Sequence, residues 1–107
     1  MWTPKRGEII KLDFDPQVGH EQQKQRPALV ISDTEFNHLG LAVVCPITSK
    51  PARHGFHVPL PAGLNTKGNV MTEQLKNVDF RARKAEYIET ASLGFTFQIR
   101  SIIAQFI

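Results

Sequence analysis

Two polar segments carry the side chains whose types and spacing could support chemistry. Residues 19–27 read Gly-His-Glu-Gln-Gln-Lys-Gln-Arg-Pro, residues 46–50 read Pro-Ile-Thr-Ser-Lys, and each segment borders an apolar run. If the two apolar runs are antiparallel neighbours, Arg26 and Thr48 emerge at the same edge of a sheet and can converge on one ligand. The guanidinium of Arg26 suits phosphate, the Thr48 hydroxyl adds a neutral donor, and Glu21 can accept a hydroxyl proton or contact a base edge. By residue type alone, an ion pair between Arg26 and a surface carboxylate is the favoured alternative.

Other kinds of reactive site find little support in the sequence. The histidines show no spacing with a carboxylate or cysteine that is typical of a metal site, so we expect no metal and no cofactor; they are His20, His38, His54 and His57. We expect His57, which falls in a strand pattern, to be a packed or edge residue. Cys45 lies inside an apolar run and is expected to be a buried, inert thiol. Neither a Gly-x-Ser-x-Gly elbow nor a phosphate-binding glycine pattern is present.

Composition and charge set the class of protein. The chain has 107 residues, of which 41% are hydrophobic and 21% charged, so we expect a single globular domain over 1–107. No apolar stretch approaches the ~20 residues of a membrane span, and the N-terminus has no apolar signal core, so we expect a cytoplasmic protein. The single Cys45 excludes an internal disulfide and fits a reducing compartment. A net charge of +3 suits a polyanionic partner without requiring one.

The residues between these segments predict mostly short strands. Apolar alternation or short apolar runs, bounded by proline, glycine and polar residues, predict strands at 7–14, 28–31, 41–47, 56–60, 70–78 and 85–88. The polar residues 16–26 are expected to form a solvent-facing loop, and residues 61–68 a turn-rich connection. Pro59 argues that its strand lies at an edge of the sheet, because proline cannot donate a backbone hydrogen bond.

Two helical segments are expected. Asp33 can cap a short turn or helical turn that runs through Asn37. Thr90 or Ser92 can cap a terminal helix, in which four apolar residues follow helical spacing, namely Ile99, Ile102, Ile103 and Phe106. Residues 95–99 also alternate with period two, so a last strand is the competing interpretation. Together the elements predict a mainly β protein, a small and strongly bent antiparallel barrel with a C-terminal helix.

A set of motifs in fixed order covers nearly the whole chain. They are Gly7-Glu8-Ile9-Ile10, Phe14-Asp15-Pro16, Gly19-x-Glu21-Gln22, Arg26-Pro27-Ala28-Leu29-Val30-Ile31-Ser32, Pro46-Ile47-Thr48-Ser49 and Glu73-Gln74-Leu75-Lys76 through Val78-Asp79. Their order and spacing closely resemble the MazF/PemK family of toxin endoribonucleases of type II toxin-antitoxin systems. The resemblance implies an SH3-like barrel, a homodimer, a cognate antitoxin, and metal-independent cleavage of single-stranded RNA at short sequences.

The resemblance also assigns roles to individual residues. The family's catalytic arginine and threonine fall on Arg26 and Thr48, and its RNA contacts fall on Glu21, Gln22 and Gln74. Three further residues are expected to bind RNA, namely His20, Ser49 and Lys50. His20 stands where many relatives have a small serine, which is a departure from the family pattern.

These roles describe a metal-free attack by the RNA 2′-hydroxyl, which leaves a 2′,3′-cyclic phosphate and a 5′-hydroxyl. We expect Arg26 to stabilise the scissile phosphate and Thr48 to hydrogen-bond at the same phosphate or at the 2′-hydroxyl. Glu21 is the candidate base. An acidic, disordered antitoxin tail would compete with RNA for the basic groove.

Two alternatives stay open at this point. The fold also suits a non-catalytic SH3-like binding module or a gyrase-targeting toxin, and the pairing of Arg26 with Thr48 favours the nuclease. The apolar C-terminal residues can serve either a dimer surface or the core, and the core is the favoured reading; they are Ile102, Ile103, Phe106 and Ile107.

Overall fold

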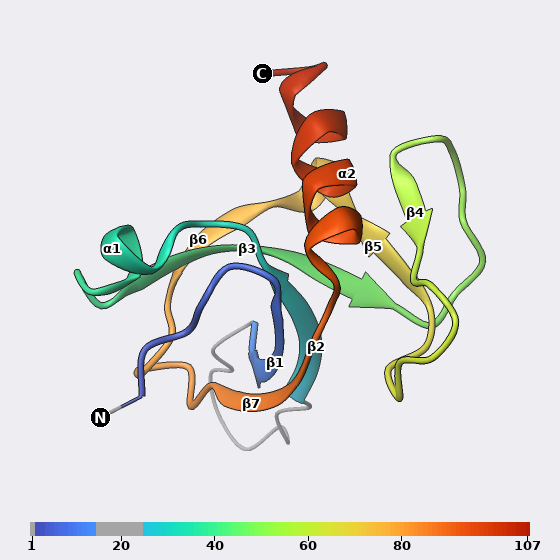
Figure 1. The fold of residues 1–107 in the computed structure, drawn as a ribbon. Helices are drawn as coiled ribbons and strands as arrows, with labels where there is room; N and C mark the ends of the chain where they lie inside the picture. Colours follow the sequence, from blue (N-terminus) through green and yellow to red (C-terminus); the bar gives the residue numbers. More distant parts are fainter. Residues whose placement is uncertain (1, 15–24) are drawn as a thin grey trace.

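The computed structural model describes residues 2–14 and 25–107. The strands are β1 (Glu8–Asp13), β2 (Gln25–Val30), β3 (Leu41–Thr48), β4 (His57–Pro59), β5 (Asn69–Met71), β6 (Lys76–Asp79) and β7 (Glu86–Thr90) (Figure 1). The helices are α1 (Thr34–Asn37), the 3-10 turn η1 (Thr72–Gln74) and α2 (Leu93–Ala104). In this part of the chain, no helix is long and apolar enough to cross a membrane. The residues His20, Glu21 and Gln22, and most of the loop expected at 16–26, lie outside the described residues.

The strands form one curved antiparallel sheet. The strand order is β4-β5-β3-β2-β1-β7, and β6, which lies outside this order, also pairs with β3. Within the described ranges β4 and β7 do not pair with each other, so the sheet is not closed and the word barrel describes it only loosely. The predicted class, mainly β with a C-terminal helix, is confirmed. Pro59 lies in the edge strand β4, as expected from its missing N–H.

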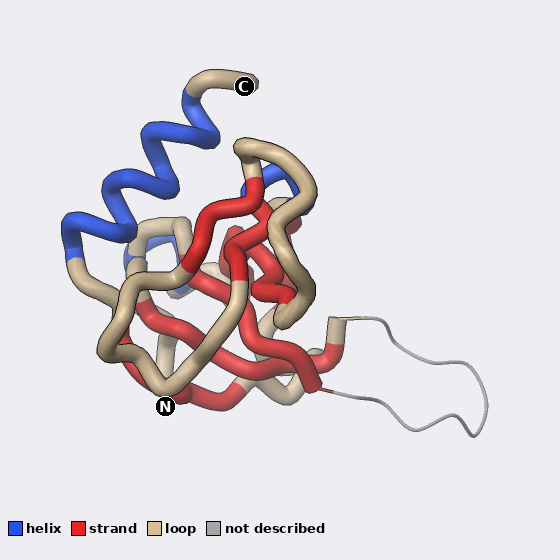
Figure 2. The backbone as a smooth tube through the Cα atoms, turned by 90° about the vertical axis from the view of Figure 1, so that its right-hand side faces the viewer, coloured by secondary structure: helices blue, strands red, loops and turns tan. Residues whose placement is uncertain are grey.

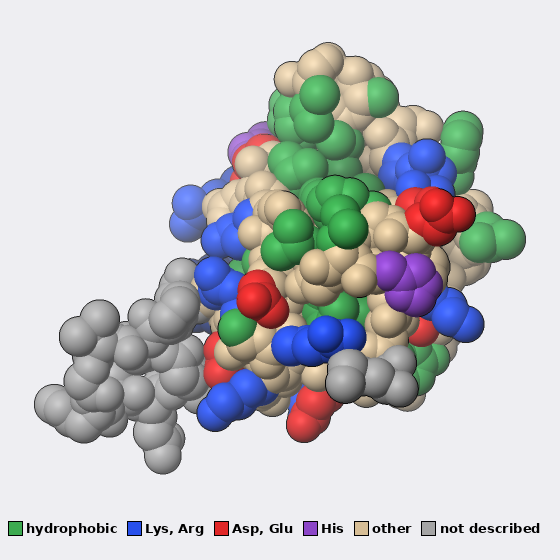
Figure 3. Space-filling model, turned by 90° about the vertical axis from the view of Figure 1, so that its left-hand side faces the viewer, with side chains coloured by type: hydrophobic (Ala, Val, Ile, Leu, Met, Phe, Trp, Pro, Cys, Tyr) green, Lys and Arg blue, Asp and Glu red, His purple; other side chains and the backbone are tan. Residues whose placement is uncertain are grey.

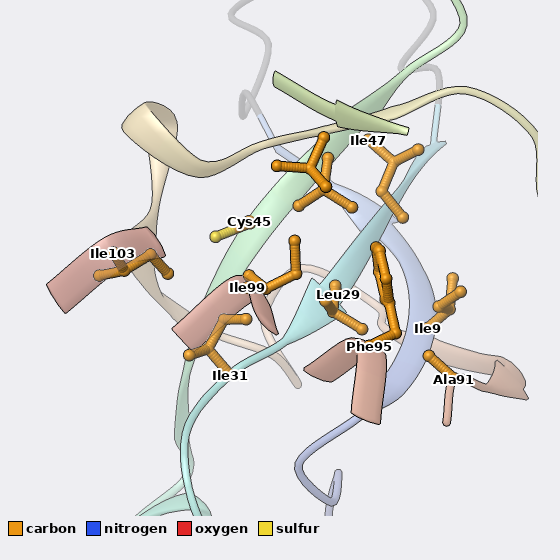
Figure 4. Packing of buried hydrophobic residues seen from close by; sticks show 11 residues of the cluster. Ile9, Leu29, Ile31, Cys45, Ile47, Ala91, Phe95, Ile99 and Ile103 are labelled. Carbon is orange, nitrogen blue, oxygen red and sulfur yellow. The ribbon is translucent and has the colours of Figure 1, made fainter. Parts of the chain in front are cut away.

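Alternating residues of the central strands face two separate apolar clusters. On β2, Leu29 belongs to the cluster beneath α2, whereas Ala28 and Val30 belong to the cluster on the opposite parity. Phe95 and Ile99 of α2 pack onto the first cluster (Figure 4), and Figure 2 shows the helix lying against one side of the strands. Because both faces of β2 are buried, its sequence has apolar residues at consecutive positions rather than at every second position.

The terminal helix begins where one of the two candidate caps predicts. The Ser92 hydroxyl accepts a hydrogen bond from the Phe95 N–H at 3.1 Å, so Ser92 is the N-cap and the strand alternative for 95–99 is wrong. Ile103 is buried and Ile102 packs against the core, which confirms the core reading for this pair. Phe106 and Ile107 are exposed, by 40% and 83%. At α1 the helical turn is confirmed, although the side chain of its N-cap, Asp33, makes no capping hydrogen bond.

The single strand expected over 70–78 is wrong. The chain instead pairs as β5 with the end of β3, turns through η1, and pairs as β6 with the beginning of β3. Thr72 is buried at this break, where its N–H and its hydroxyl both donate to the Phe56 carbonyl, at 3.1 Å and 2.7 Å. These bonds satisfy the backbone locally and project the next two residues, Glu73 and Gln74, outward.

Candidate functional site

Arg26 and Thr48 lie side by side on neighbouring strands. β2 and β3 pair antiparallel, with Ala28 opposite Pro46. Arg26 lies two residues before Ala28 and Thr48 two residues after Pro46, so this register brings Arg26 level with Thr48. Arg26 belongs to β2 and pairs with Leu12 of β1, which corrects its expected place in the loop. Thr48 is the last residue of β3. The predicted convergence is therefore confirmed, and both side chains start from hydrogen-bonded strands.

Both residues line an open cavity of about 380 Å³, within the usual size of ligand sites. Its walls are Arg26, Thr48, Lys50, Pro51, Arg53, His54, His57, Met71, Glu73 and Gln74. A second hollow of about 320 Å³ shares Arg26, Thr48 and Lys50 and adds Ser49 and Lys67. The structure thus brings five predicted site residues together, namely Arg26, Thr48, Ser49, Lys50 and Gln74.

The charge of the cavity favours an anion. Its walls carry three cationic side chains, those of Arg26, Lys50 and Arg53, against one carboxylate, that of Glu73. Among residues 2–14 and 25–107, no carboxylate lies within ion-pair distance of Arg26. The surface ion pair weighed for Arg26 therefore does not form within this part of the chain, and its guanidinium can face a ligand.

Hydrogen bonds fix the chain on either side of Thr48. The Lys50 N–H donates to the Thr48 Oγ1 at 3.2 Å, and the Asn69 amide donates to the Lys50 carbonyl at 3.0 Å. In the first of these contacts the Thr48 hydroxyl is the acceptor, so its own proton can be donated to a ligand. The half-buried side chain of Thr48 is thereby held at the cavity wall with a donor to offer.

Gly68 packs directly against the Thr48 backbone. It has φ of +123°, a conformation that L side chains rarely adopt, and a Cβ at this position would overlap the Thr48 carbonyl oxygen. The connection at 61–68 is also tied to β7, because the Asn65 and Thr66 N–H groups donate to the Glu89 carboxylate at 3.0 Å and 2.7 Å. The hydrogen bond from the Thr66 hydroxyl and those from the two backbone groups hold the pKa of Glu89 below its ordinary value.

A cluster of His54, His57 and Glu73 forms one wall of the cavity. The Glu73 Oε2 lies 2.9 Å from the His57 Nε2 and 3.7 Å from the His54 Nε2, and the two imidazole rings are 4.3 Å apart. Burial raises the pKa of Glu73, but the hydrogen bond from His57 and the two nearby imidazoles outweigh burial and leave this pKa below its ordinary value. His57 is buried, as expected for a packed residue.

This cluster was not predicted from the sequence. The histidines show no spacing typical of a metal site along the chain, and Glu73 is 16 residues away from His57. The signal that could have found it is strand pairing, since β4 and β5 place His57 opposite Met71, two residues before Glu73.

The three side chains could in principle hold a metal ion, since their ligand atoms lie within 4.8 Å of one another. Metal-bound histidines usually carry a proton on the second ring nitrogen and donate it to an acceptor. Here that nitrogen faces a donor in both rings: the His57 Nδ1 accepts from the Arg53 N–H at 3.3 Å, and the His54 Nδ1 accepts from the Phe56 N–H at 3.2 Å. The arrangement therefore fits a His57 imidazole that donates to Glu73, with the His54 imidazole beside the same oxygen, better than it fits metal ligands.

Cys45 takes no part in this chemistry. It is fully buried in the core beneath α2. Burial, and secondarily the Glu73 charge, raises the pKa of its thiol to about 12. The thiolate is the reactive form, so the expected inert thiol is confirmed.

The contact between Gly68 and Thr48 predicts a large effect of adding one methyl group. Gly68→Ala should lower the free energy of unfolding by more than the roughly 1–3 kcal/mol typical of backbone strain alone, because the added Cβ also displaces the Thr48 carbonyl. Gly63→Ala is the matched control, since Gly63 has φ of +99° and nothing lies within 4 Å of an added Cβ. Urea unfolding of both variants measures the difference, and equal losses would show that the close approach to Thr48 carries no weight.

Comparisons with known proteins identify the family of this chain. A family model described as PemK-like, MazF-like toxin of type II toxin-antitoxin system matches residues 5–107. The chain is 44% identical over 93 residues to the endoribonuclease toxin ChpB of Escherichia coli K12, covering 82% of this chain and 80% of ChpB. It is 39% identical over 90 residues to the Escherichia coli endoribonuclease PemK, covering 79% of this chain and 68% of PemK.

Solved structures show the same architecture. A MazE-MazF crystal structure from Deinococcus radiodurans matches with a TM-score of 0.90 and 36% identity, covering 98% of this chain and 96% of that chain. A MazF crystal structure from the same organism matches with a TM-score of 0.87 and 36% identity, covering 98% of this chain and 96% of that chain. With a family model spanning nearly all of its length, this chain belongs to the PemK-like, MazF-like toxin family of type II toxin-antitoxin systems.

Proposed function

We propose that this chain, an endoribonuclease toxin of the PemK/MazF family, cuts single-stranded RNA at short sequences in the cavity that Arg26 and Thr48 share. The observation that carries the proposal is the placement of these two donors by adjacent strands on one wall. Lys50 and Arg53 add positive charge to the same cavity. RNA is a polyanion, and its phosphate is the group that a guanidinium binds best.

The proposed reaction uses the RNA's own 2′-hydroxyl as the nucleophile. Its oxygen attacks the neighbouring phosphorus, and negative charge grows on the phosphorane oxygens as the bond to the 5′-oxygen breaks. Arg26 stabilises this charge with two parallel N–H groups, and Thr48 donates its hydroxyl proton to a phosphate oxygen. Because a guanidinium stays protonated at all ordinary pH values, we assign Arg26 to charge stabilisation rather than to proton transfer.

Polar side chains around the cavity would read the bases. Gln74 and Ser49 lie at its walls and can hydrogen-bond to the edges of splayed bases, as is usual in recognition of single-stranded RNA. His20, Glu21 and Gln22, which lie outside the described residues, are proposed RNA contacts by resemblance to the family.

The cognate antitoxin is the second partner. A MazF relative forms a crystal complex with MazE, and for this chain we propose an antitoxin whose acidic tail occupies the basic cavity and competes with RNA. Among the described residues that line the cavity, Glu73 is the one carboxylate, so the cavity keeps a net positive lining for such a tail.

A homodimer is part of the proposal. Four large apolar side chains on or just after α2 are exposed, namely Leu93, Phe97, Phe106 and Ile107. Apolar side chains gather over the α2 end of the face in Figure 3, whereas Lys and Arg are interspersed with acidic and apolar groups lower down. Exposed apolar groups of this kind suit contact with a second copy.

The first experiment tests the reaction itself. Purified protein incubated with a long RNA should cut it at defined sites, leave 2′,3′-cyclic phosphate ends, and keep its rate in excess EDTA. Replacing the ribose 5′ of the cut phosphate by deoxyribose should abolish cutting, because the nucleophile is gone. Cutting of the deoxy substrate would contradict 2′-hydroxyl attack, and no cutting of any RNA would favour a non-catalytic binding module or a gyrase-targeting toxin.

The second experiment tests the two donors. Arg26→Ala should slow single-turnover cleavage by on the order of 10²- to 10³-fold, and Arg26→Lys should recover little, because an ammonium cannot reproduce the planar fork. Thr48→Val keeps the shape of the side chain and removes the hydroxyl, so it should slow cleavage as well.

Stability provides the control for these variants. Arg26 is exposed, so its truncation should change the free energy of unfolding by under about 0.5 kcal/mol. Near wild-type cutting by Arg26→Ala, or unfolding of both Arg26→Ala and Thr48→Val, would remove the catalytic assignment.

A further inference from the structure

One carboxylate of β7 ties down the connection between β4 and β5. Glu89 accepts hydrogen bonds from the Asn65 N–H at 3.0 Å, the Thr66 N–H at 2.7 Å and the Thr66 hydroxyl at 2.6 Å. We propose that Glu89 is a positioning residue for RNA cleavage, which holds the Thr48 hydroxyl at the scissile phosphate through this connection. The inference rests on the proposed function and adds to it a residue that lines neither hollow of the site.

The strand β7 sets the direction of this carboxylate. Glu89 lies opposite Ile9 of β1, directly after a β-bulge at Ile88. Residues opposite one another in an antiparallel pair share a face of the sheet. Glu89 therefore lies on the face of Ile9, where Leu64 of the connection packs against the same apolar cluster. An apolar contact and a carboxylate thus anchor neighbouring residues of the connection.

The carboxylate is ionised where it meets the connection. The hydrogen bond from the Thr66 hydroxyl, those from the two backbone N–H groups and the nearby Lys67 ammonium hold the pKa of Glu89 below its ordinary value. Both oxygens are used, since Oε1 accepts from Asn65 and Oε2 accepts from both groups of Thr66. Hydrogen bonds to an ionised acceptor are roughly twice as strong as neutral ones. The connection is therefore well held at residues 65 and 66.

The next residues of the connection contact the segment that carries Thr48, where the chain passes the end of β3 (Figure 1). Gly68 packs against the Thr48 carbonyl, and Asn69 pairs with Thr48 between β5 and β3. The Asn69 amide also donates to the Lys50 carbonyl at 3.0 Å, and the Lys50 N–H donates to the Thr48 Oγ1 at 3.2 Å. Only Lys67 separates the two residues that Glu89 binds from the two that contact this segment.

This chain of contacts bears on the Thr48 hydroxyl more than on Arg26. Release of residues 65 and 66 would free Gly68 and Asn69 to move away from Thr48. Arg26 is held separately, by the pairing of β2 with β1. Because a misplacement of about 1 Å at a reacting centre can cost on the order of 10²-fold in rate, the loss of Glu89 should slow cleavage through Thr48.

Glu89→Gln tests the proposal, because the amide keeps the size of the side chain but offers one acceptor oxygen in place of two. Its single-turnover cleavage rate at saturating RNA should fall by about 10- to 100-fold. The matched control is Glu86→Gln, which removes the same charge from the same strand, where Glu86 makes an exposed ion pair with Lys11. The control should cut at the wild-type rate. Both variants should bind an uncleavable RNA, with deoxyribose at the cut site, equally well.

A double-mutant cycle with Thr48→Val separates positioning from a general loosening of the fold. If Glu89 acts through the Thr48 hydroxyl, Glu89→Gln should add little to the loss of rate that Thr48→Val already causes, because the positioned group is gone. Equal slowing by Glu89→Gln with Thr48 and with Val at position 48 would overturn the proposal, since Glu89 would then only stabilise the fold.

Amide hydrogen exchange gives a readout that needs no RNA. The Asn65 and Thr66 N–H groups should exchange faster in Glu89→Gln than in Glu86→Gln, and unchanged exchange at both would overturn the proposed tie. Should Glu89→Gln fail to fold, Thr66→Val gives the same test, because it removes the shortest of the three hydrogen bonds and leaves the charge in place. Its slowing should also vanish beside Thr48→Val, and a wild-type rate in folded Thr66→Val would overturn the proposal.

The outcomes separate this inference from the proposed function. Failure of the wild-type chain to cut any RNA would overturn the proposed function and this inference with it. Cutting by Glu89→Gln at the rate of Glu86→Gln, with Arg26→Ala inactive, would overturn the role of Glu89 alone.

Discussion

The pairing of β2 with β3 is the constraint on which the rest of the site depends. Its register, with Ala28 opposite Pro46, brings Arg26 level with Thr48, and a slip of either strand by one residue would turn its side chain to the opposite face from the other. The two apolar clusters secure this register, since Leu29 is buried beneath α2 while Ala28 and Val30 are buried on the opposite side. The same core packing that stabilises the sheet therefore sets the spacing of the two donors.

The remainder of the cavity is built by elements that meet the end of β3. β5 pairs with Ile47 and Thr48, Gly68 lies against the Thr48 carbonyl, and the η1 turn presents Glu73 and Gln74. Arg26 supplies charge from one strand, whereas Glu73 is held by imidazoles from the segment leading into β4 and from its first residue. The cavity thus combines cationic side chains that can stabilise a phosphorane with a single carboxylate among the described residues of its walls.

Much of this could be predicted from the sequence, for physical reasons. The apolar runs before Asp13, after Pro27 and before Thr48 are strong strand signals, and two adjacent strands with polar ends predict convergence. The break at Thr72 could not be predicted, because period-two alternation continues across it and only the contact with the Phe56 carbonyl shows the turn. The meeting of Glu73 with His57 was hidden for the same reason, since it depends on the pairing of β4 with β5 and not on local spacing.

The most direct test is a crystal structure of the protein with an RNA that carries deoxyribose at the cut site. The account predicts that the phosphate at the cut lies in the cavity, with its oxygens within hydrogen-bond distance of the Arg26 guanidinium and the Thr48 hydroxyl. An RNA bound elsewhere on the molecule, with its phosphate away from both side chains, would contradict the assignment of this cavity as the reaction centre.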